Sequence, residues 1–150
     1  MDEARIRKRK GWVLGVLCLC LIVIGLDNTI LNVAIPALER DLEATNSQLQ
    51  WIVDAYTLIF AGLLLTMGSM GDRFGRKGAL MAGLAVFGTG SLLSGMAQSA
   101  TQLTVCRALM GIGAALIMPA TLSLLTTIFP DPRERGRAIG IWAAVAGASS

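Results

Sequence analysis

Three ionisable residues, Asp27, Asp54 and Arg107, interrupt stretches of apolar and small polar residues in this 150-residue sequence. A charge inside an apolar membrane segment is costly, and such residues usually mark functional sites. Burial favours the protonated form of a carboxylic acid and a nearby cation favours the carboxylate, so a change of exposure loads or releases a proton. Two acids and one base at a similar depth therefore predict proton exchange in a shared polar cavity, driven by a proton gradient and without a cofactor.

Three other roles stay open for these residues. One is a static ion pair between Asp27 and Arg107, and another is a purely interfacial Asp54. A third is an intramembrane aspartyl protease, because general acid–base cleavage needs two close carboxylates. The Tyr-Asp and Gly-x-Gly-Asp contexts of such proteases are absent from the sequence. An enzyme is therefore the remote alternative.

The elements that carry these residues are expected to be membrane helices. Hydrophobic residues make up 54% of the chain and charged residues 15%, which excludes an ordinary soluble domain. Long uncharged runs approach or exceed the roughly 17 to 25 residues that cross a bilayer as a helix. The predicted helices span about 12–37, 50–71, 78–97, 101–127 and 136–150, the last incomplete. We therefore expect an all-α polytopic membrane protein, in which a transmembrane bundle at 12–150 follows a basic amino terminus at 1–11.

The fifth apolar run stops without a polar or basic end. We interpret the chain as the front part of a longer protein whose carboxy-terminal half is absent. A signal peptide is disfavoured for the first segment, because its apolar run is too long and lacks a clear cleavage site.

Basic residues alternate between the predicted loops. Lys and Arg number five before the first helix and then one, three, none and three in the successive connections. This is the positive-inside pattern, which predicts a cytoplasmic amino terminus and a multi-pass protein of the cell membrane. The basic arm is accordingly assigned to topology and lipid contact rather than to nucleic acid, despite the net charge of +3.

Neither metal ligands nor a disulfide framework is indicated. The sequence has no histidine, and Cys18, Cys20 and Cys106 all fall within predicted helices. Small residues four apart predict close helix packing at three pairs. These pairs are Ser91/Gly95, Gly111/Ala115 and Gly140/Ala144.

The segment from Gly68 to Leu80 reads Gly-Ser-Met-Gly-Asp-Arg-Phe-Gly-Arg-Lys-Gly-Ala-Leu and lies between two apolar runs. Its four charges and four glycines predict a tight cytoplasmic turn between two membrane helices. It resembles the signature turn of the major facilitator superfamily. The stretch from Leu103 to Ala115, built around Arg107, is similar to the fourth-helix motif of the same superfamily, although Met110 stands where Gln is common.

The stretch from Leu26 to Pro36 looks like the first-helix motif of the fourteen-helix drug:proton antiporter group. With Gln50-Trp-Ile-Val-Asp-Ala-Tyr56, the likeness extends to bacterial efflux pumps for quaternary ammonium compounds and dyes. The resemblance implies export of lipophilic or quaternary cations by alternating access, with Asp27 as the main proton acceptor and Asp54 assisting. Tyr56 and Phe60 would supply aromatic contact to the substrate. A porter of the same fold for another solute stays open as the alternative.

The resemblance also implies a charge latch at the cytoplasmic turn. Asp72 would meet a helix of the absent half, and Arg76 would hold Asp72 or an acid of the next inner loop. The residues assigned to this latch are Gly68, Asp72, Arg73, Gly75, Arg76, Lys77, Asp131 and Glu134.

Overall fold

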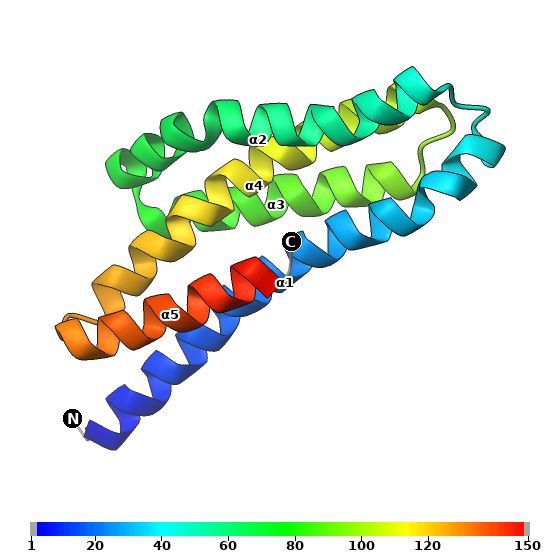
Figure 1. Cartoon of the computed structure of the whole chain (residues 1–150). Helices are drawn as coiled ribbons and strands as arrows, with labels where there is room; N and C mark the ends of the chain where they lie inside the picture. The colour runs from blue at the N-terminus through cyan, green and yellow to red at the C-terminus, as the bar shows by residue number, and fades with distance from the viewer. Residues whose placement is uncertain (1–2, 149–150) are drawn as a thin grey trace.

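The computed structural model describes residues 3–148, and these residues form five α-helices and no strand (Figure 1). The helices are α1 (Glu3–Asp41), α2 (Asn46–Phe74), α3 (Arg76–Gly95), α4 (Ala100–Ile128) and α5 (Pro132–Ala148). The predicted all-α class is confirmed. Residues 1–2 of the predicted arm and residues 149–150 of the fifth predicted helix lie outside the described part of the chain.

The basic arm is part of the first helix, contrary to the predicted boundary at residue 12, because α1 begins at Glu3. Arg and Lys have high helix propensity, and no proline interrupts the arm. Glu3 in the first turn complements the positive end of the helix dipole. The charged arm and the apolar span therefore form one continuous helix.

Local sequence signals explain several other helix ends. Thr45 caps α2 in a reciprocal capping box with Gln48, whose side chain accepts a hydrogen bond from the Thr45 backbone N–H at 2.9 Å. The Ser99 side chain caps α4 by accepting from the Gln102 N–H at 3.2 Å. Between α2 and α3, Gly75 has φ +110°, a conformation that residues with a side chain rarely adopt.

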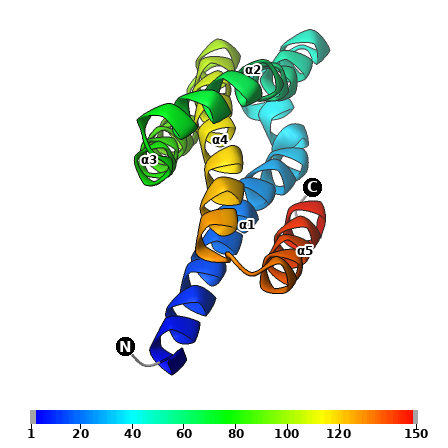
Figure 2. The same cartoon turned by 90° about the vertical axis from the view of Figure 1, so that its left-hand side faces the viewer.

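The central helix is α4, which packs most extensively against α2 and α3 on one side (Figure 2). On its other side lie α1 and α5, which pack against each other. The start of α1 and the α2–α3 and α4–α5 turns share one end of the bundle, and the other two connections share the opposite end (Figure 1). The three clusters rich in Lys and Arg therefore lie at the same end, as the positive-inside pattern requires.

Glycines allow close approach between α4 and its neighbours. A Cβ added at Gly111 would lie 2.8 Å from the Tyr56 carbonyl oxygen, and one at Gly113 would lie 2.7 Å from the Phe87 backbone nitrogen. Gly95 and Gly140, by contrast, have no neighbour within 4 Å of an added Cβ. The packing predicted at Ser91/Gly95 and Gly140/Ala144 is thus not made among the described residues.

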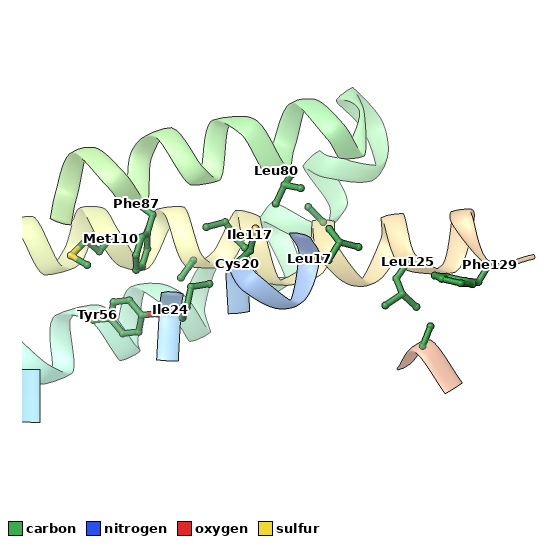
Figure 3. Close-up of a cluster of buried hydrophobic side chains, with 13 residues drawn as sticks. Leu17, Cys20, Ile24, Tyr56, Leu80, Phe87, Met110, Ile117, Leu125 and Phe129 are labelled. Atoms are coloured by element: carbon green, nitrogen blue, oxygen red, sulfur yellow. The ribbon is translucent and has the colours of Figure 1, made fainter. Parts of the chain in front are cut away.

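Buried apolar side chains line α4 along most of its length (Figure 3). Leu17, Cys20 and Ile24 of α1 meet this cluster from one side. Phe87 of α3 and Tyr56 of α2 meet it from the others. Four described helices, α1 to α4, are long and apolar enough to cross a membrane, and their outward surfaces carry many exposed large hydrophobic side chains. This arrangement fits a membrane bundle whose outward faces meet lipid or further helices.

Candidate functional site

The structure joins two of the three predicted intramembrane charges in an ion pair. Arg107 of α4 donates from Nη1 to Oδ2 of Asp27 on α1, and from Nη2 to Oδ1 of Asn28 at 3.2 Å. The Arg107 side chain is 3% exposed, and the Asp27 side chain is 21% exposed. A buried charge needs such partners, because isolation from water is costly. The pair therefore couples α1 to α4 deep within the bundle.

An aromatic ring completes the surroundings of the guanidinium. Its carbon Cζ lies 4.5 Å from the centroid of the Tyr56 ring, a cation–π distance. Phe60, one turn along α2, stacks on Tyr56 with centroids 6.1 Å apart and an interplanar angle of 5°. The two predicted substrate-contacting aromatics are therefore adjacent, but in this conformation one of them already binds a cation of the protein itself.

One donor of the buried arginine is unused. The Nε–H of Arg107 has no hydrogen-bond partner among the described residues. A buried donor without a partner costs on the order of 1–3 kcal/mol. Arg107 therefore retains a donor for an additional acceptor.

The predicted three-residue cluster is not formed, because Asp54 makes no ion pair or side-chain hydrogen bond to the described residues. The helical period explains this result. Ile52, Ala55 and Tyr56 are the buried positions of this part of α2, and Asp54 precedes Tyr56 by two residues, about 200° around the helix. The rotation of α2 that places Tyr56 against Arg107 therefore directs the half-buried Asp54 away from Arg107. Among the described residues, no hydrogen bond joins Asp54 to Asp27.

A second polar cluster lies at the α2–α3 turn. Arg76 Nε, at the start of α3, lies 3.6 Å from Oδ1 of Asp72, four residues earlier on α2. The Ser123 hydroxyl of α4 donates to the same carboxylate oxygen at 3.3 Å. Arg76 Nη1 donates to the Thr127 hydroxyl and to the Ser123 carbonyl oxygen, the latter at 3.5 Å. We refer to Asp72, Arg76, Ser123 and Thr127 as the turn cluster, which ties the α2–α3 turn to α4.

The remaining turn residues divide into backbone and surface positions. A Cβ added at Gly68 would lie 3.3 Å from Pro119 Cβ, so α2 passes close to α4 there. Gly75 makes the turn itself with its positive φ. Arg73 and Lys77 are exposed, and neither makes an ion pair or side-chain hydrogen bond to the described residues.

The two acids predicted as alternative partners of Arg76 have other partners. Glu134 of α5 forms an ion pair with Lys10 of α1 at 3.3 Å. Asp131 accepts a hydrogen bond from the Glu134 backbone N–H at 3.2 Å, which caps the start of α5. Of the two alternatives predicted for Arg76, the structure thus shows Asp72 rather than an acid of the next inner loop, because α5 packs beside α1 whereas Arg76 is held against α4.

Sequence reasoning missed four polar partners. Asn28 was not singled out as a partner of Arg107, and Lys10 was considered only as part of the basic arm. Ser123 and Thr127 were not singled out, although their spacing of four residues places two hydroxyls on one helix face. That spacing was the available signal, but nothing local identifies Arg76 as their partner.

No metal centre is indicated by the described residues. They contain no group of three or more His, Cys, Asp or Glu side chains that could hold an ion. Their cysteines, Cys18, Cys20 and Cys106, are free thiols.

Comparison with known proteins shows which family and which individual proteins this chain resembles. The family model of the Major Facilitator Superfamily matches residues 17–150. The puromycin resistance protein pur8 of Streptomyces alboniger is 42% identical over 139 residues, which cover 93% of this chain and 28% of that protein.

Two further relatives are equally similar. The methyl viologen resistance protein SmvA of Salmonella typhimurium is 42% identical over 91% of this chain and 28% of its own. The multidrug efflux pump LfrA of Mycolicibacterium smegmatis is 45% identical over 89% of this chain and 27% of its own. The chain therefore spans slightly more than a quarter of the length of these relatives.

Proposed function

Because this chain belongs to the major facilitator superfamily, we propose that it is the amino-terminal part of a proton-coupled multidrug exporter. The proposal places the exporter in the bacterial cytoplasmic membrane, with its amino terminus in the cytoplasm. Three similar proteins are named for puromycin resistance, methyl viologen resistance and multidrug efflux, which supports export of foreign compounds. Lipophilic or quaternary cations are the proposed substrates, because an acid in an apolar cavity attracts a cation and releases it on protonation.

The observation that carries the coupling mechanism is the ion pair between Asp27 and Arg107. Arg107 is buried and keeps its positive charge, because a guanidinium does not lose its proton. Asp27 is partly exposed, so its carboxylate is the member of the pair that a proton can reach. Protonation of Asp27 removes the charge that holds α1 to α4 at this depth. The released guanidinium keeps Asn28 and the Tyr56 ring as partners, which limits the cost of opening the pair.

We propose that the turn cluster is the conformational latch of alternating access. Asp72 and Arg76 hold the α2–α3 turn against Ser123 and Thr127 of α4. Breaking these contacts would allow α2 to move relative to α4, and reforming them would stabilise the conformation described above. The proton site and the latch thus act on the same helix from opposite ends.

The test is dye accumulation in cells that express the full-length protein. Wild type, Asp27→Asn and Asp54→Asn are compared, each with and without a protonophore. We expect wild type to lower accumulation, Asp27→Asn or the protonophore to abolish the effect, and Asp54→Asn to retain much of it because Asp54 lies outside the ion pair. Undiminished proton-coupled export by Asp27→Asn would remove Asp27 from this role.

A second candidate is an exporter of a single antibiotic with the same fold. The observation that favours it is the naming of relatives for one compound, such as the methylenomycin A resistance protein of Streptomyces coelicolor, 43% identical over 83% of this chain. Resistance profiling with a panel of dyes, quaternary cations and antibiotics separates the two candidates. Protection against one antibiotic class alone, at good membrane expression, would favour the narrower exporter.

A further inference from the structure

The basic start of α1 presents two different surfaces. On one, Lys10 forms an ion pair with Glu134 and lies 5.7 Å from the centroid of the Phe129 ring. On the other, Arg5, Lys8 and Arg9 are all exposed and make no ion pair or side-chain hydrogen bond to the described residues. Three neighbouring positive charges on that second surface are therefore uncompensated.

These charges and the apolar residues that follow them in sequence form one stripe along the same side of α1. The stripe consists of Arg5, Lys8, Arg9, Trp12, Gly15, Val16 and Leu19. The spacings of three and four residues place all seven on one helix face. Every member is exposed, and Trp12 is 71% exposed. The stripe is basic at its amino-terminal end and apolar toward its carboxy-terminal end.

Two adjoining hollows follow this stripe. The basic hollow has a volume of about 470 Å³ and is lined by Arg5, Ile6, Lys8, Arg9 and Trp12, with no acid. The apolar hollow, of about 640 Å³, is lined by Lys8, Gly11, Trp12, Gly15, Val16 and Leu19. An added Cβ at Gly11 or Gly15 would meet no atom within 4 Å, so the two glycines leave a shallow groove in the helix surface. Lys8 and Trp12 line both hollows and join them.

The position of the stripe matches the layers of a bilayer. Exposed tryptophan side chains are typical of the membrane interface. At about 1.5 Å per residue, Lys8 and Arg9 lie roughly 5 Å beyond Trp12 along the axis, and Leu19 lies about 10 Å on its other side. The headgroup layer is on the order of 5–7 Å thick on each side of the hydrocarbon core. The basic hollow is thus at headgroup level, and the apolar hollow is at acyl-chain level.

We propose that this face of α1 is a binding site for one anionic phospholipid. Arg5, Lys8 and Arg9 bind the phosphate and the headgroup charge, and an acyl chain lies along the groove at Gly11 and Gly15 beside Trp12. An amphipathic ligand is required because the two hollows are continuous and opposite in character. A free phosphate would leave the apolar hollow unused, and a zwitterionic lipid would leave positive charge uncompensated.

The test uses quenching of Trp12 fluorescence in the full-length protein, reconstituted in phosphatidylcholine vesicles. Equal mole fractions of brominated phosphatidylglycerol or brominated phosphatidylcholine are added, and the Trp12 component is obtained by subtracting the signal of Trp12→Phe. We expect stronger quenching by the anionic lipid. Equal quenching of wild-type Trp12 by the two lipids would overturn the proposal.

Matched variants separate a defined site from general attraction to a charged membrane. The double change Lys8→Gln/Arg9→Gln is expected to lower the preference for the anionic lipid roughly fivefold per base removed. Arg7→Gln removes one charge of the same arm from the opposite face, beside Glu3 and Glu134, and should change the preference less than twofold. Similar losses per charge in both variants would show diffuse attraction and contradict the site.

Two further experiments test whether the acyl chain contributes to binding. Gly15→Leu fills the groove at a position with free space around it, so folding is retained and the anionic preference should fall. Soluble glycerophosphate at the same concentration should not displace the brominated lipid. An unchanged preference in Gly15→Leu, or displacement by glycerophosphate, would show that the phosphate alone is bound and would overturn the phospholipid assignment.

Discussion

Asp27 and Arg107 are 80 residues apart in sequence, and their side chains form an ion pair between α1 and α4. Few other polar contacts join α1 to the α2–α4 group among the described residues, and the direct contact of α1 with α2 is small. A single ion pair, in which only the carboxylate can change its charge, therefore carries much of the polar attachment of α1 to the rest of the bundle. Protonation of Asp27 would therefore weaken the attachment of α1 to α4.

Removing one partner of this pair should be far more costly than replacing both. Asp27→Leu leaves the 3% exposed Arg107 without its anion and should cost roughly 3–5 kcal/mol of unfolding free energy. Arg107→Met should cost less, because Asp27 is more exposed. The double variant Asp27→Leu/Arg107→Met should lie closer to wild type than Asp27→Leu does. Thermal unfolding of the full-length protein in detergent measures these differences, and strictly additive losses would show that the pair is not coupled.

The close approach of α3 and α4 should make Gly113 intolerant of any side chain. A Cβ there would lie 2.7 Å from the Phe87 nitrogen and 2.8 Å from the Gly83 carbonyl oxygen, and neither backbone atom can move away freely. Gly113→Ala should lower the unfolding free energy by about 1–3 kcal/mol. The control is Gly88→Ala on α3, where no atom lies within 4 Å and higher helix propensity should stabilise by up to about 1 kcal/mol. Equal effects would contradict this packing.

The α2–α3 turn should require glycine at one position only. Gly75 has φ +110°, and an alanine forced into that region costs on the order of 1–3 kcal/mol. Gly78 lies in the first turn of α3 with open space around it, so Gly78→Ala should be neutral or stabilising. Unfolding temperatures of the two variants, measured side by side, check the difference. An unaffected Gly75→Ala would mean that the turn adopts another backbone conformation.

The turn cluster should depend on the Thr127 hydroxyl. Thr127 accepts a hydrogen bond from Arg76, and because this bond is exposed to solvent it should contribute about 0.5–1.5 kcal/mol. Thr127→Val should therefore lower the unfolding free energy by roughly that amount, with some relief from the carbonyl oxygen of Ser123, which Arg76 also contacts. Thr126→Val is the matched control, since that hydroxyl donates only to the Ser123 carbonyl and should change stability by less than about 0.5 kcal/mol.

The ion pair between Lys10 and Glu134 should behave as a surface pair, unlike Asp27 and Arg107. Its side chains are 25% and 48% exposed, and exposed pairs typically contribute about 0.2–1 kcal/mol. A double-mutant cycle with Lys10→Gln and Glu134→Gln should give a coupling energy in that range. Added salt should reduce it, because charges at the surface are screened. A coupling that is large and independent of salt would indicate a buried pair.

Much of the secondary structure follows from local pattern. Uncharged runs of membrane-spanning length predicted the helices of the described chain, and Gly75 marked the turn between α2 and α3. The contact between Asp72 and Arg76 was expected from the resemblance of the turn, and its partners lie on different helices, α2 and α3, on either side of Gly75. The first helix boundary was misplaced because charge was read as the end of the helix, whereas Arg and Lys continue a helix readily.

The sequence by itself determined the helical class and the placement of the basic residues at one end of the bundle. It also determined that charged residues, which are costly to bury, lie within apolar helices. These properties depend on composition and on periods of a few residues, which act within one helix. Only the tertiary structure decided that Arg107 pairs with Asp27 and Asn28 rather than Asp54, and that Glu134 meets Lys10 rather than Arg76. Those choices depend on the rotation and offset of neighbouring helices, which packing at residues such as Gly111 and Gly113 sets across large separations in sequence.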